Sequence, residues 1–409
     1  MNKSPLNMNG IGGNGESPEE ERRFSPWPYY GQDEVAAAMR VLQSGHVNYW
    51  TGPEGRQFEE EFAALVGARH AVALMNGSVA LEASLMALGV APGDEIIVSS
   101  RTFIASASCV ILRGGRPVMA DVDPDSQNIT AETVAEVLTP GTKGIIAVHL
   151  AGWPCEMNPM MDLAREKGLW VVEDCAQASG AAYKGQPVGS FGDAAAFSFC
   201  QDKIISTGGE GGMLATGRRD LWERVWSYKD HGKSFEAVYC REHSPGFKWF
   251  HESFGTNGRM TEMQAAIGRV QLRKLPEWLN IRRRNAAILT EGFSRIPGLR
   301  LTIPSREIEH AYYKYYVFVE PEALKSDWSR DRILVSLMDE GIPCGTGSCS
   351  EIYLEKAFDR DGLRPPKRFP VAKELGETSL MFPVHPTLSV DEMAEMVTAV
   401  DRIMTRAIR

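Results

Sequence analysis

The sequence contains no apolar run that approaches the roughly 20 residues needed to cross a bilayer. Its N-terminus has no basic stretch followed by an apolar one, so no secretory signal is expected. The seven cysteines form no C-x-x-C pair, which is typical of free thiols in a reducing compartment and not of a disulfide framework or a zinc site. We therefore expect a cytoplasmic protein that holds no metal.

Positive charge is also in short supply, because 44 Lys and Arg stand against 53 Asp and Glu and give a net charge of −9. This balance does not suit nucleic acid or an anionic membrane as the main partner. The glycine-rich stretch 208–212 has no G-x-G-x-x-G that opens a helix and no Walker lysine. Nucleotide-binding loops of those kinds are therefore excluded, whereas small anionic ligands are not, since local donors hold them.

The chain does contain a long alternation of strand-like and helix-like segments. The strand-like runs are 71–75, 96–99, 118–122, 145–149, 169–173, 194–199 and 212–216. The helical patterns between most of them are 81–88, 104–112, 131–138, 157–167 and 221–226. Apolar strands alternating with helices predict an α/β fold with a mostly parallel, seven-stranded sheet covered on both faces. Functional sites of such sheets lie beyond the carboxyl ends of the strands.

The rest of the chain divides around this region. Residues 1–25 are rich in Asn, Gly, Ser, Pro and Glu and are predicted to be a flexible tail. A large domain is expected over 26–285, ending in a long helix near 261–278, and a smaller α+β domain over 286–409. The spacing of Val35, Met39 and Leu42 predicts a short N-terminal helix, which we expect to pack on the smaller domain. In that domain we expect a strand over 312–320 and helices over 329–340 and 390–406, the last capped by Ser389.

Four predicted strand ends carry residues suited to chemistry. Asn76-Gly77-Ser78-Val79 follows the first strand, and free amides at a helix start plus the Ser78 hydroxyl form a cradle for phosphate, although the same letters also suit an ordinary capped turn. Phe103 follows the second strand, where its ring either stacks on a flat ligand or packs in the core. Asp174 ends a buried strand, where it either meets a cation or caps the next segment.

Lys203 lies just past the strand 194–199, and Ser198 precedes it by five residues. A lysine at the end of a core strand loses part of its solvation, which favours the neutral, nucleophilic amine. The alternative is a solvated loop lysine. We interpret the nearby Cys200 as a small residue at the core edge. Phosphate donors, a stacking ring, a carboxylate and a reactive lysine in this order together predict a site for pyridoxal 5'-phosphate (PLP).

The motifs also carry a family resemblance. They are Asn76–Leu81, Val172–Gln177, Phe197–Phe199 with Lys203 and Glu210–Gly212, and Asn257–Ala266. From about residue 28 onward the chain resembles the DegT/StrS-type sugar aminotransferases, which are fold-type I PLP enzymes of the aspartate aminotransferase superfamily. The resemblance implies that Lys203 forms a Schiff base with PLP and later moves a proton.

Further roles follow from the resemblance alone. Asp174 would pair with the pyridine nitrogen, Phe103 would stack on the ring, and Gln177 would contact the region of its 3-hydroxyl. Gly77, Ser78, the Val79 amide and Ser198 would form the phosphate site. Asn257 would reach the phosphate from the neighbouring subunit, which makes a homodimer with shared active sites the expected unit.

The resemblance implies a two-step reaction between an amino acid donor, L-glutamate, and a nucleotide-linked keto-sugar. Pyridoxamine 5'-phosphate would carry the amino group between the steps. Amination at C4 of a 4-keto-6-deoxy sugar, for amino-sugar and polysaccharide biosynthesis, is the first expectation. The alternatives are a C3 aminotransferase, a PLP-dependent dehydratase, and a regulator without catalysis. Lysine at 203 favours amino transfer, because dehydratases of this group carry histidine there.

Three segments depart from the family pattern, and all border the expected sugar pocket. One extra glycine lies between Thr207 and Glu210. Residues 345–353 replace a stretch with Tyr and His, and residues 233–253 are unusually aromatic and charged. These departures bear on the identity of the sugar and not on the cofactor.

Overall fold

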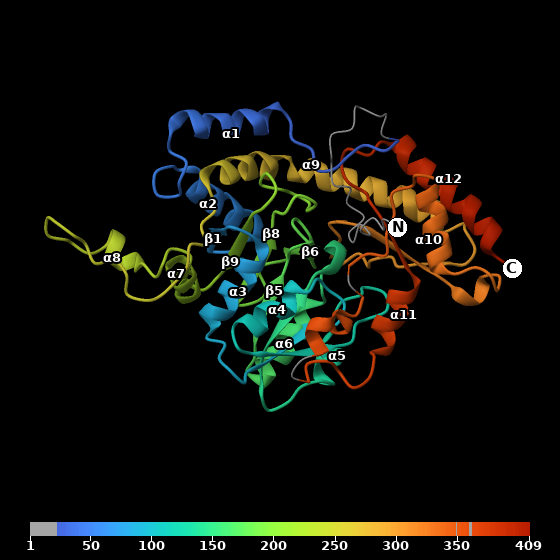
Figure 1. Ribbon diagram of the computed structural model, residues 1–409, viewed down its shortest axis with the longest axis horizontal. Coiled ribbons are helices and arrows are strands. Elements are labelled where there is room, and N and C mark those ends of the chain that lie inside the picture. The colour runs from blue at the N-terminus through green and yellow to red at the C-terminus, as the bar shows by residue number, and fades with distance from the viewer. Residues whose placement is uncertain (1–22, 349, 360–361) are drawn as a thin grey trace, which may run out of the picture.

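The computed structural model describes residues 23–348, 350–359 and 362–409, so most of the predicted tail lies outside the described residues. A seven-stranded sheet forms the centre (Figure 1), as predicted. In spatial order its strands are β1 (His70–Leu74), β9 (Gly212–Thr216), β8 (Ala194–Ser198), β5 (Trp170–Asp174), β4 (Thr142–Val148), β2 (Glu95–Ser99) and β3 (Arg116–Ala120). β9 runs antiparallel to β1 and β8, and the other neighbours are parallel. The prediction of a mostly parallel α/β sheet is confirmed.

Helices cover both faces of this sheet. They are α2 (Glu54–Val66), α3 (Gly77–Leu88), α4 (Ala105–Leu112), α5 (Ala131–Ala135), α6 (Met157–Lys167), α7 (Arg219–Tyr228) and α9 (Glu262–Phe293). Side chains of a strand point alternately to the two faces, so Val72 and Leu74 of β1 pack with α3, α4 and α7. Ala71 and Ala73 pack instead with α2 and α9.

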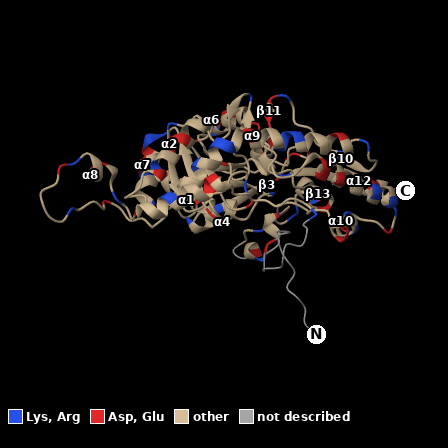
Figure 2. Cartoon of the chain, turned by 90° about the horizontal axis from the view of Figure 1, so that it is seen from above, with Lys and Arg blue, Asp and Glu red and all other residues tan. Residues whose placement is uncertain are grey.

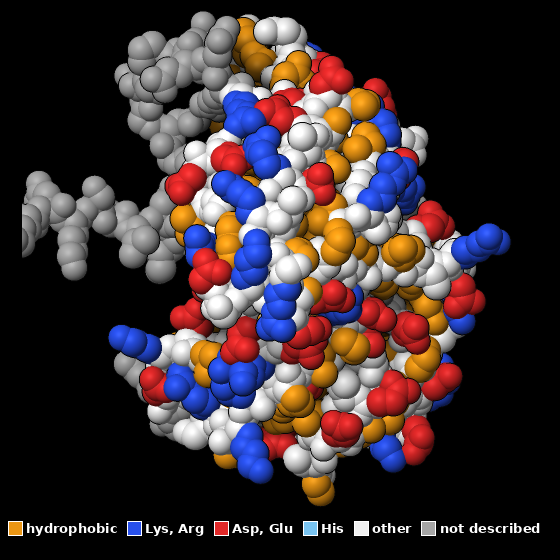
Figure 3. Space-filling model, turned by 90° about the vertical axis from the view of Figure 1, so that its right-hand side faces the viewer, with side chains coloured by type: hydrophobic (Ala, Val, Ile, Leu, Met, Phe, Trp, Pro, Cys, Tyr) orange, Lys and Arg blue, Asp and Glu red, His pale blue; other side chains and the backbone are white. Residues whose placement is uncertain are grey.

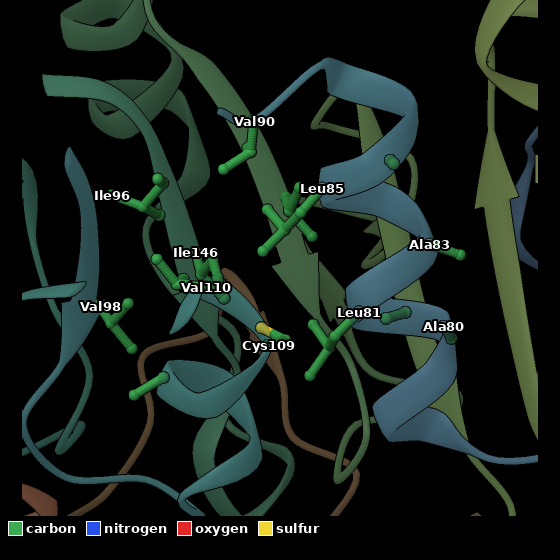
Figure 4. Packing of buried hydrophobic residues seen from close by; sticks show 14 of the residues in the cluster. Ala80, Leu81, Ala83, Leu85, Val90, Ile96, Val98, Cys109, Val110 and Ile146 are labelled. Carbon is green, nitrogen blue, oxygen red and sulfur yellow. The ribbon is translucent and has the colours of Figure 1, made fainter. Parts of the chain in front are cut away.

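Large aliphatic side chains fill the space between α3 and the sheet. Figure 4 shows Leu81 and Leu85 of α3 in one cluster with Val110 of α4 and Ile146 of β4. All four are buried, and each such side chain contributes about 2 kcal/mol by leaving water. This packing fixes the first turn of α3 against the carboxyl ends of the strands, where the chemistry was predicted.

The long helix α9 runs further than predicted and joins two cores. Its first half buries Leu275 and Trp278 against the large domain, and its second half buries Leu289 and Phe293 in the core of the smaller domain. The predicted range 261–278 was therefore too short at its end. Pro276 lies inside the helix and does not end it.

The smaller domain contains a three-stranded sheet of β10 (Leu299–Leu301), β12 (Tyr315–Val319) and β13 (Ser379–Phe382). Its helices are α10 (Arg330–Asp339), α11 (Pro370–Thr378) and α12 (Val390–Ala407), and Ser389 caps α12 as predicted. A small sheet pairs β6 (Ala182–Tyr183) and β7 (Gln186–Pro187) of the large domain with β11 (Ile308–Glu309) of the smaller one. Figure 3 shows acidic and basic side chains interspersed on the end of the molecule that carries α10 and α12.

The N-terminal helix α1 (Gln32–Ser44) differs from its prediction in two ways. It packs on the first half of α9, where Ala37 and Val41 contact Ala266 and Val270, and not on the smaller domain. The predicted stripe at 35, 39 and 42 is exposed. The smaller domain is contacted instead by Phe24, just before the helix.

A segment over 233–255 projects from the large domain, as Figures 1 and 2 show from two directions. It contains the short helix α8 (Phe235–Tyr239) and four exposed rings, Tyr239, Phe247, Trp249 and Phe254. We call this segment the arm. In the described part of the chain, no helix is both long enough and apolar enough to cross a membrane.

Candidate active site

The predicted site residues meet at the carboxyl ends of β1, β2, β5 and β8. Asp174 is the last residue of β5 and Ser198 the last of β8. The first turn of α3 reaches this edge directly, because a Cβ atom added to Gly77 would lie 2.7 Å from the Cβ of Ser198. Only glycine permits this approach, so Ser78 and Ser198 border the same space.

The first turn of α3 presents unpaired backbone donors to that space. Asn76 caps the helix by accepting from the Val79 amide at 2.9 Å, so this amide is already engaged. Within the described residues, the amides of Gly77 and Ser78 have no hydrogen-bond partner. Free amides with the positive end of a helix favour an anion. The donors available to a phosphate are therefore these two amides and the neighbouring hydroxyls.

Asp174 is a buried carboxylate with few partners. Its Oδ2 accepts from the Ser106 hydroxyl at 2.7 Å and its Oδ1 from the Ala176 amide at 3.1 Å. Burial raises the pKa of the Asp174 carboxyl, while these hydrogen bonds and the positive charge of Lys203 oppose that rise. A second cation placed against Asp174 would stabilise its ionised form. Ser106, which faces Asp174 from the first turn of α4, was not predicted as a site residue.

Lys203 lies on a tight loop after β8. Its amide donates to the Cys200 carbonyl at 3.0 Å, and its carbonyl accepts from the indole of Trp27 at 3.0 Å. The side chain is only 18% exposed, and its Nζ lies 3.4 Å from the Tyr313 hydroxyl and 3.6 Å from Asp202 Oδ1. Lys203 is therefore not a solvated loop lysine.

Phe103 is exposed to solvent, whereas Gln177 is buried. Phe103 is 63% exposed, so its ring is not part of the core and is free to stack on a ligand. Gln177 is buried, accepts from the Ala151 amide at 2.7 Å and donates to the Ser348 hydroxyl at 3.3 Å. Gln177 thus ties the unusual segment 345–353 of the smaller domain to this edge of the sheet.

The segment that begins with Asn257 lies beside the end of β1 in the same chain. The Gly258 carbonyl accepts from the Met75 amide at 2.9 Å, and the side chain of Asn257 is exposed. Later residues of this motif have structural roles: Thr261 caps α9, and Glu262 accepts from the first amides of α2.

Beneath the site lies a buried polar cluster whose role the sequence did not reveal. Glu173 accepts from the amides of Gly189, Phe191 and Gly192 and from Nε2 of His149. His149 Nδ1 accepts from the Cys155 amide, which places the ring proton on Nε2. Among the described residues, His149, Glu173 and Cys175 are the one group close enough to hold a metal, but these atoms of His149 and Glu173 are already bonded.

The observed arrangement fits PLP. Two free helix amides and two serine hydroxyls suit its phosphate, the buried Asp174 suits a protonated ring nitrogen, and the exposed Phe103 offers a stacking face. Lys203 supplies the amine. The close approach at Gly77 is needed to bring the phosphate donors of α3 and β8 together.

Comparisons with known proteins point the same way. A sequence model described as the DegT/DnrJ/EryC1/StrS aminotransferase family matches residues 28–401. An aminotransferase from Psychrobacter cryohalolentis of known structure is 54% identical with a TM-score of 0.92, over 94% of this chain and 99% of that one. GDP-perosamine synthase from Caulobacter vibrioides is 35% identical, over 87% and 92% of the two chains. A dTDP-3-amino-3,4,6-trideoxy-alpha-D-glucose transaminase from Streptomyces venezuelae is also 35% identical, over 89% and 90%.

Proposed function

Since this chain belongs to the DegT/DnrJ/EryC1/StrS aminotransferase family, we propose that it transfers the amino group of L-glutamate to a nucleotide-linked keto-sugar. The enzyme is a sugar aminotransferase of a PLP-dependent family. The finer proposal is amination at C4 of a 4-keto-6-deoxy sugar, for amino-sugar and polysaccharide biosynthesis. It is supported by the resemblance of the segment Lys203–Gly212 to members that act at C4. The observation that carries the reaction type is the meeting of Lys203, Asp174 and the first turn of α3 at one edge of the sheet.

PLP, when bound, supplies an aldehyde that takes up the amino group and a ring that delocalises negative charge. The protein binds its phosphate with the Gly77 and Ser78 amides and the hydroxyls of Ser78 and Ser198. The resemblance implies that the Val79 amide also contacts the phosphate. This amide already donates to Asn76 Oδ1, so it would have to donate to both oxygens.

Asp174 keeps the ring nitrogen protonated, because a buried carboxylate pairs strongly with an adjacent cation. Ser106 holds the carboxylate in place from one side. Phe103 would cover one face of the ring, and Gln177 would orient the side of the ring that carries the 3-hydroxyl.

Lys203 would hold the cofactor through its amine until the donor amino acid takes its place. The freed amine then removes a proton from one carbon and returns it to the other, as general base and then general acid. The Lys203 amino group lies between Asp174 of the ring site and Tyr313 of the smaller domain.

A reduction experiment tests this role. Borohydride treatment of the purified protein should fix a cofactor adduct on the peptide that contains Lys203, and Lys203→Ala should lose both the adduct and amino transfer. An adduct on another lysine, or full turnover of Lys203→Ala, would disprove the assignment. Incubating the enzyme and glutamate with 4-keto and 3-keto nucleotide sugars, read by product mass, tests the position of amination and separates the C4 proposal from the C3 alternative.

We also propose a homodimer in which Asn257 serves the site of the neighbouring subunit. Its exposed side chain, next to the projecting arm with its exposed rings, supports this assignment. Mixing Lys203→Ala with Asn257→Ala subunits tests it. If Asn257 serves the partner, mixed dimers regain one complete site and hence activity, whereas an Asn257 that serves its own subunit leaves every mixed dimer impaired.

A further inference from the structure

We propose that Asp202 and Tyr313 are positioning residues that hold the amino group of Lys203 whenever it is free of the cofactor. The inference rests on the proposed role of Lys203. It adds two residues that do not touch the carbon atoms that react. The sequence gives no hint of Tyr313, which lies 110 residues from Lys203 and reaches it from the smaller domain.

The three side chains form a closed triangle. The Tyr313 hydroxyl donates to Asp202 Oδ2 in a short hydrogen bond. Lys203 Nζ donates to that same hydroxyl at 3.4 Å and lies 3.6 Å from Asp202 Oδ1. Nζ is also 4.8 Å from the centre of the Tyr313 ring, within the range of a cation–π contact. An ammonium at this place has an anion, an acceptor and an aromatic ring around it.

The surroundings of Tyr313 and Asp202 keep each of them in the required protonation state. Burial and the negative charge of Asp202 raise the pKa of the Tyr313 phenol well above its ordinary value, so the phenol keeps its proton. Burial alone would raise the pKa of Asp202, but Lys203, Tyr313 and Lys314 hold it below the ordinary value, so the carboxylate stays ionised. The pair therefore presents one negative charge to Lys203.

The other charged groups around the triangle are mostly positive. Lys314 follows Tyr313 directly, and Arg282 approaches from α9 with Nη1 donating to the Tyr313 carbonyl at 3.3 Å. On the far side, Asp174 faces Lys203 from β5 and belongs to the ring site. Without Asp202, the anion left near a Lys203 ammonium would be Asp174, which the ring site uses, while the charge of Lys314 would repel it.

This geometry has a defined use in the proton shift. Lys203 gains one proton from the first carbon and gives up that same proton to the second, while Asp202 and Tyr313 keep their own protonation throughout. The carboxylate and the phenol hold the intermediate ammonium beside the reacting carbons. They prevent the flexible side chain from turning into solvent between the two transfers.

The first test uses the apoprotein and needs no turnover. We would measure the rate of covalent PLP uptake against pH for wild type, Asp202→Asn and Tyr313→Phe, with uptake read by absorbance. Only the neutral amine reacts, so the pH midpoint of the rate reports how well the ammonium is held. Asp202→Asn keeps the shape but removes the charge, and we expect its midpoint to fall by about one pH unit or more.

Tyr313→Phe should lower the midpoint less, because Asp202 stays, but should slow the half-reaction with glutamate about tenfold, since the amine loses its fixed place. Tyr312→Phe is the matched control, because the neighbouring ring stacks on His310 and not on Lys203. Thermal unfolding of each variant verifies folding.

The outcomes separate this proposal from the proposed function. A midpoint for Asp202→Asn equal to that of wild type, with the borohydride adduct still on Lys203, overturns the positioning role alone. An equal shift in Tyr312→Phe overturns it too, because the effect would then be unspecific. Loss of the Lys203 adduct in wild type would overturn the proposed function itself.

Discussion

Replacing the buried Glu173 by glutamine should destabilise the protein by about 3 to 6 kcal/mol. Its Oε1 accepts from the Phe191 and Gly192 amides, each at 2.8 Å. Its Oε2 accepts from the Gly189 amide at 2.8 Å and from His149 Nε2 at 3.1 Å. All four donors point at one carboxylate that has no contact with water.

The magnitude follows from what a glutamine can offer at this place. Its oxygen keeps one pair of donors, but its NH₂ group must face the other pair, donor against donor. Each hydrogen bond to a charged group contributes about 1.5 to 3 kcal/mol, and two are lost. The proton of His149 cannot move to its other nitrogen, because Nδ1 accepts from the Cys155 amide. The cluster therefore has no way to adapt.

Urea unfolding at fixed protein concentration measures the effect, and Glu166→Gln is the matched control, since that side chain on α6 is 69% exposed. The control should stay within about 0.5 kcal/mol of wild type. A loss of less than about 1 kcal/mol in Glu173→Gln would refute the idea that the carboxylate organises the loop over 189–192.

Three further changes have defined outcomes. Asp174→Asn should retain bound PLP but lose amino transfer by about 10²-fold or more, because the ring nitrogen loses its anion; wild-type rates in a glutamate half-reaction would contradict this. Gly77→Ala should weaken PLP binding at least about tenfold, since the new Cβ meets Ser198 at 2.7 Å, and equilibrium titration of the apoprotein shows whether it does. Burial lowers the pKa of His310 to about 3, so below about pH 6.5 the unfolded chain binds a proton that the folded chain does not. The free energy of unfolding should therefore fall as the pH is lowered, by about 1.4 kcal/mol per pH unit more in wild type than in His310→Asn. Urea unfolding of both proteins at about pH 6 and about pH 4 measures this difference. An equal loss of stability in the two proteins would rule it out.

The sheet and its strand ends could be predicted because their signals are local. A run such as 194–199 is apolar except for Ser198 near its end, and a strand buried on both faces has that pattern. The residues that follow such runs lie at one edge for topological reasons, so Asp174, Ser198 and Gly77 could be grouped from order alone.

Other features depend on contacts that local patterns do not contain. Helical spacing in α1 indicated Val35, Met39 and Leu42, yet the buried side is lined by Ala37 and Val41, whose small side chains allow α1 to lie close to α9. Periodicity gives the period of a helix but not which of two apolar sides meets a partner.

Tyr313 was missed for a related reason. Its segment shows only an aromatic strand, and nothing there reveals that the phenol reaches a lysine on another domain. Likewise, Glu173 and Asp174 are adjacent carboxylates that the sequence does not distinguish. Only the fold shows that Glu173 accepts from backbone amides whereas Asp174 lies at the ring site.

The unbroken helix α9 limits how this enzyme can move. A rod of 32 residues, about 48 Å long, is anchored by Leu275 in one core and by Phe293 in the other. Swinging the two halves of the molecule apart would require bending this rod, and its weakest point is Pro276, where one backbone bond is missing. We therefore expect differences in the room for the sugar to come from loops such as 345–353, while α9 stays straight.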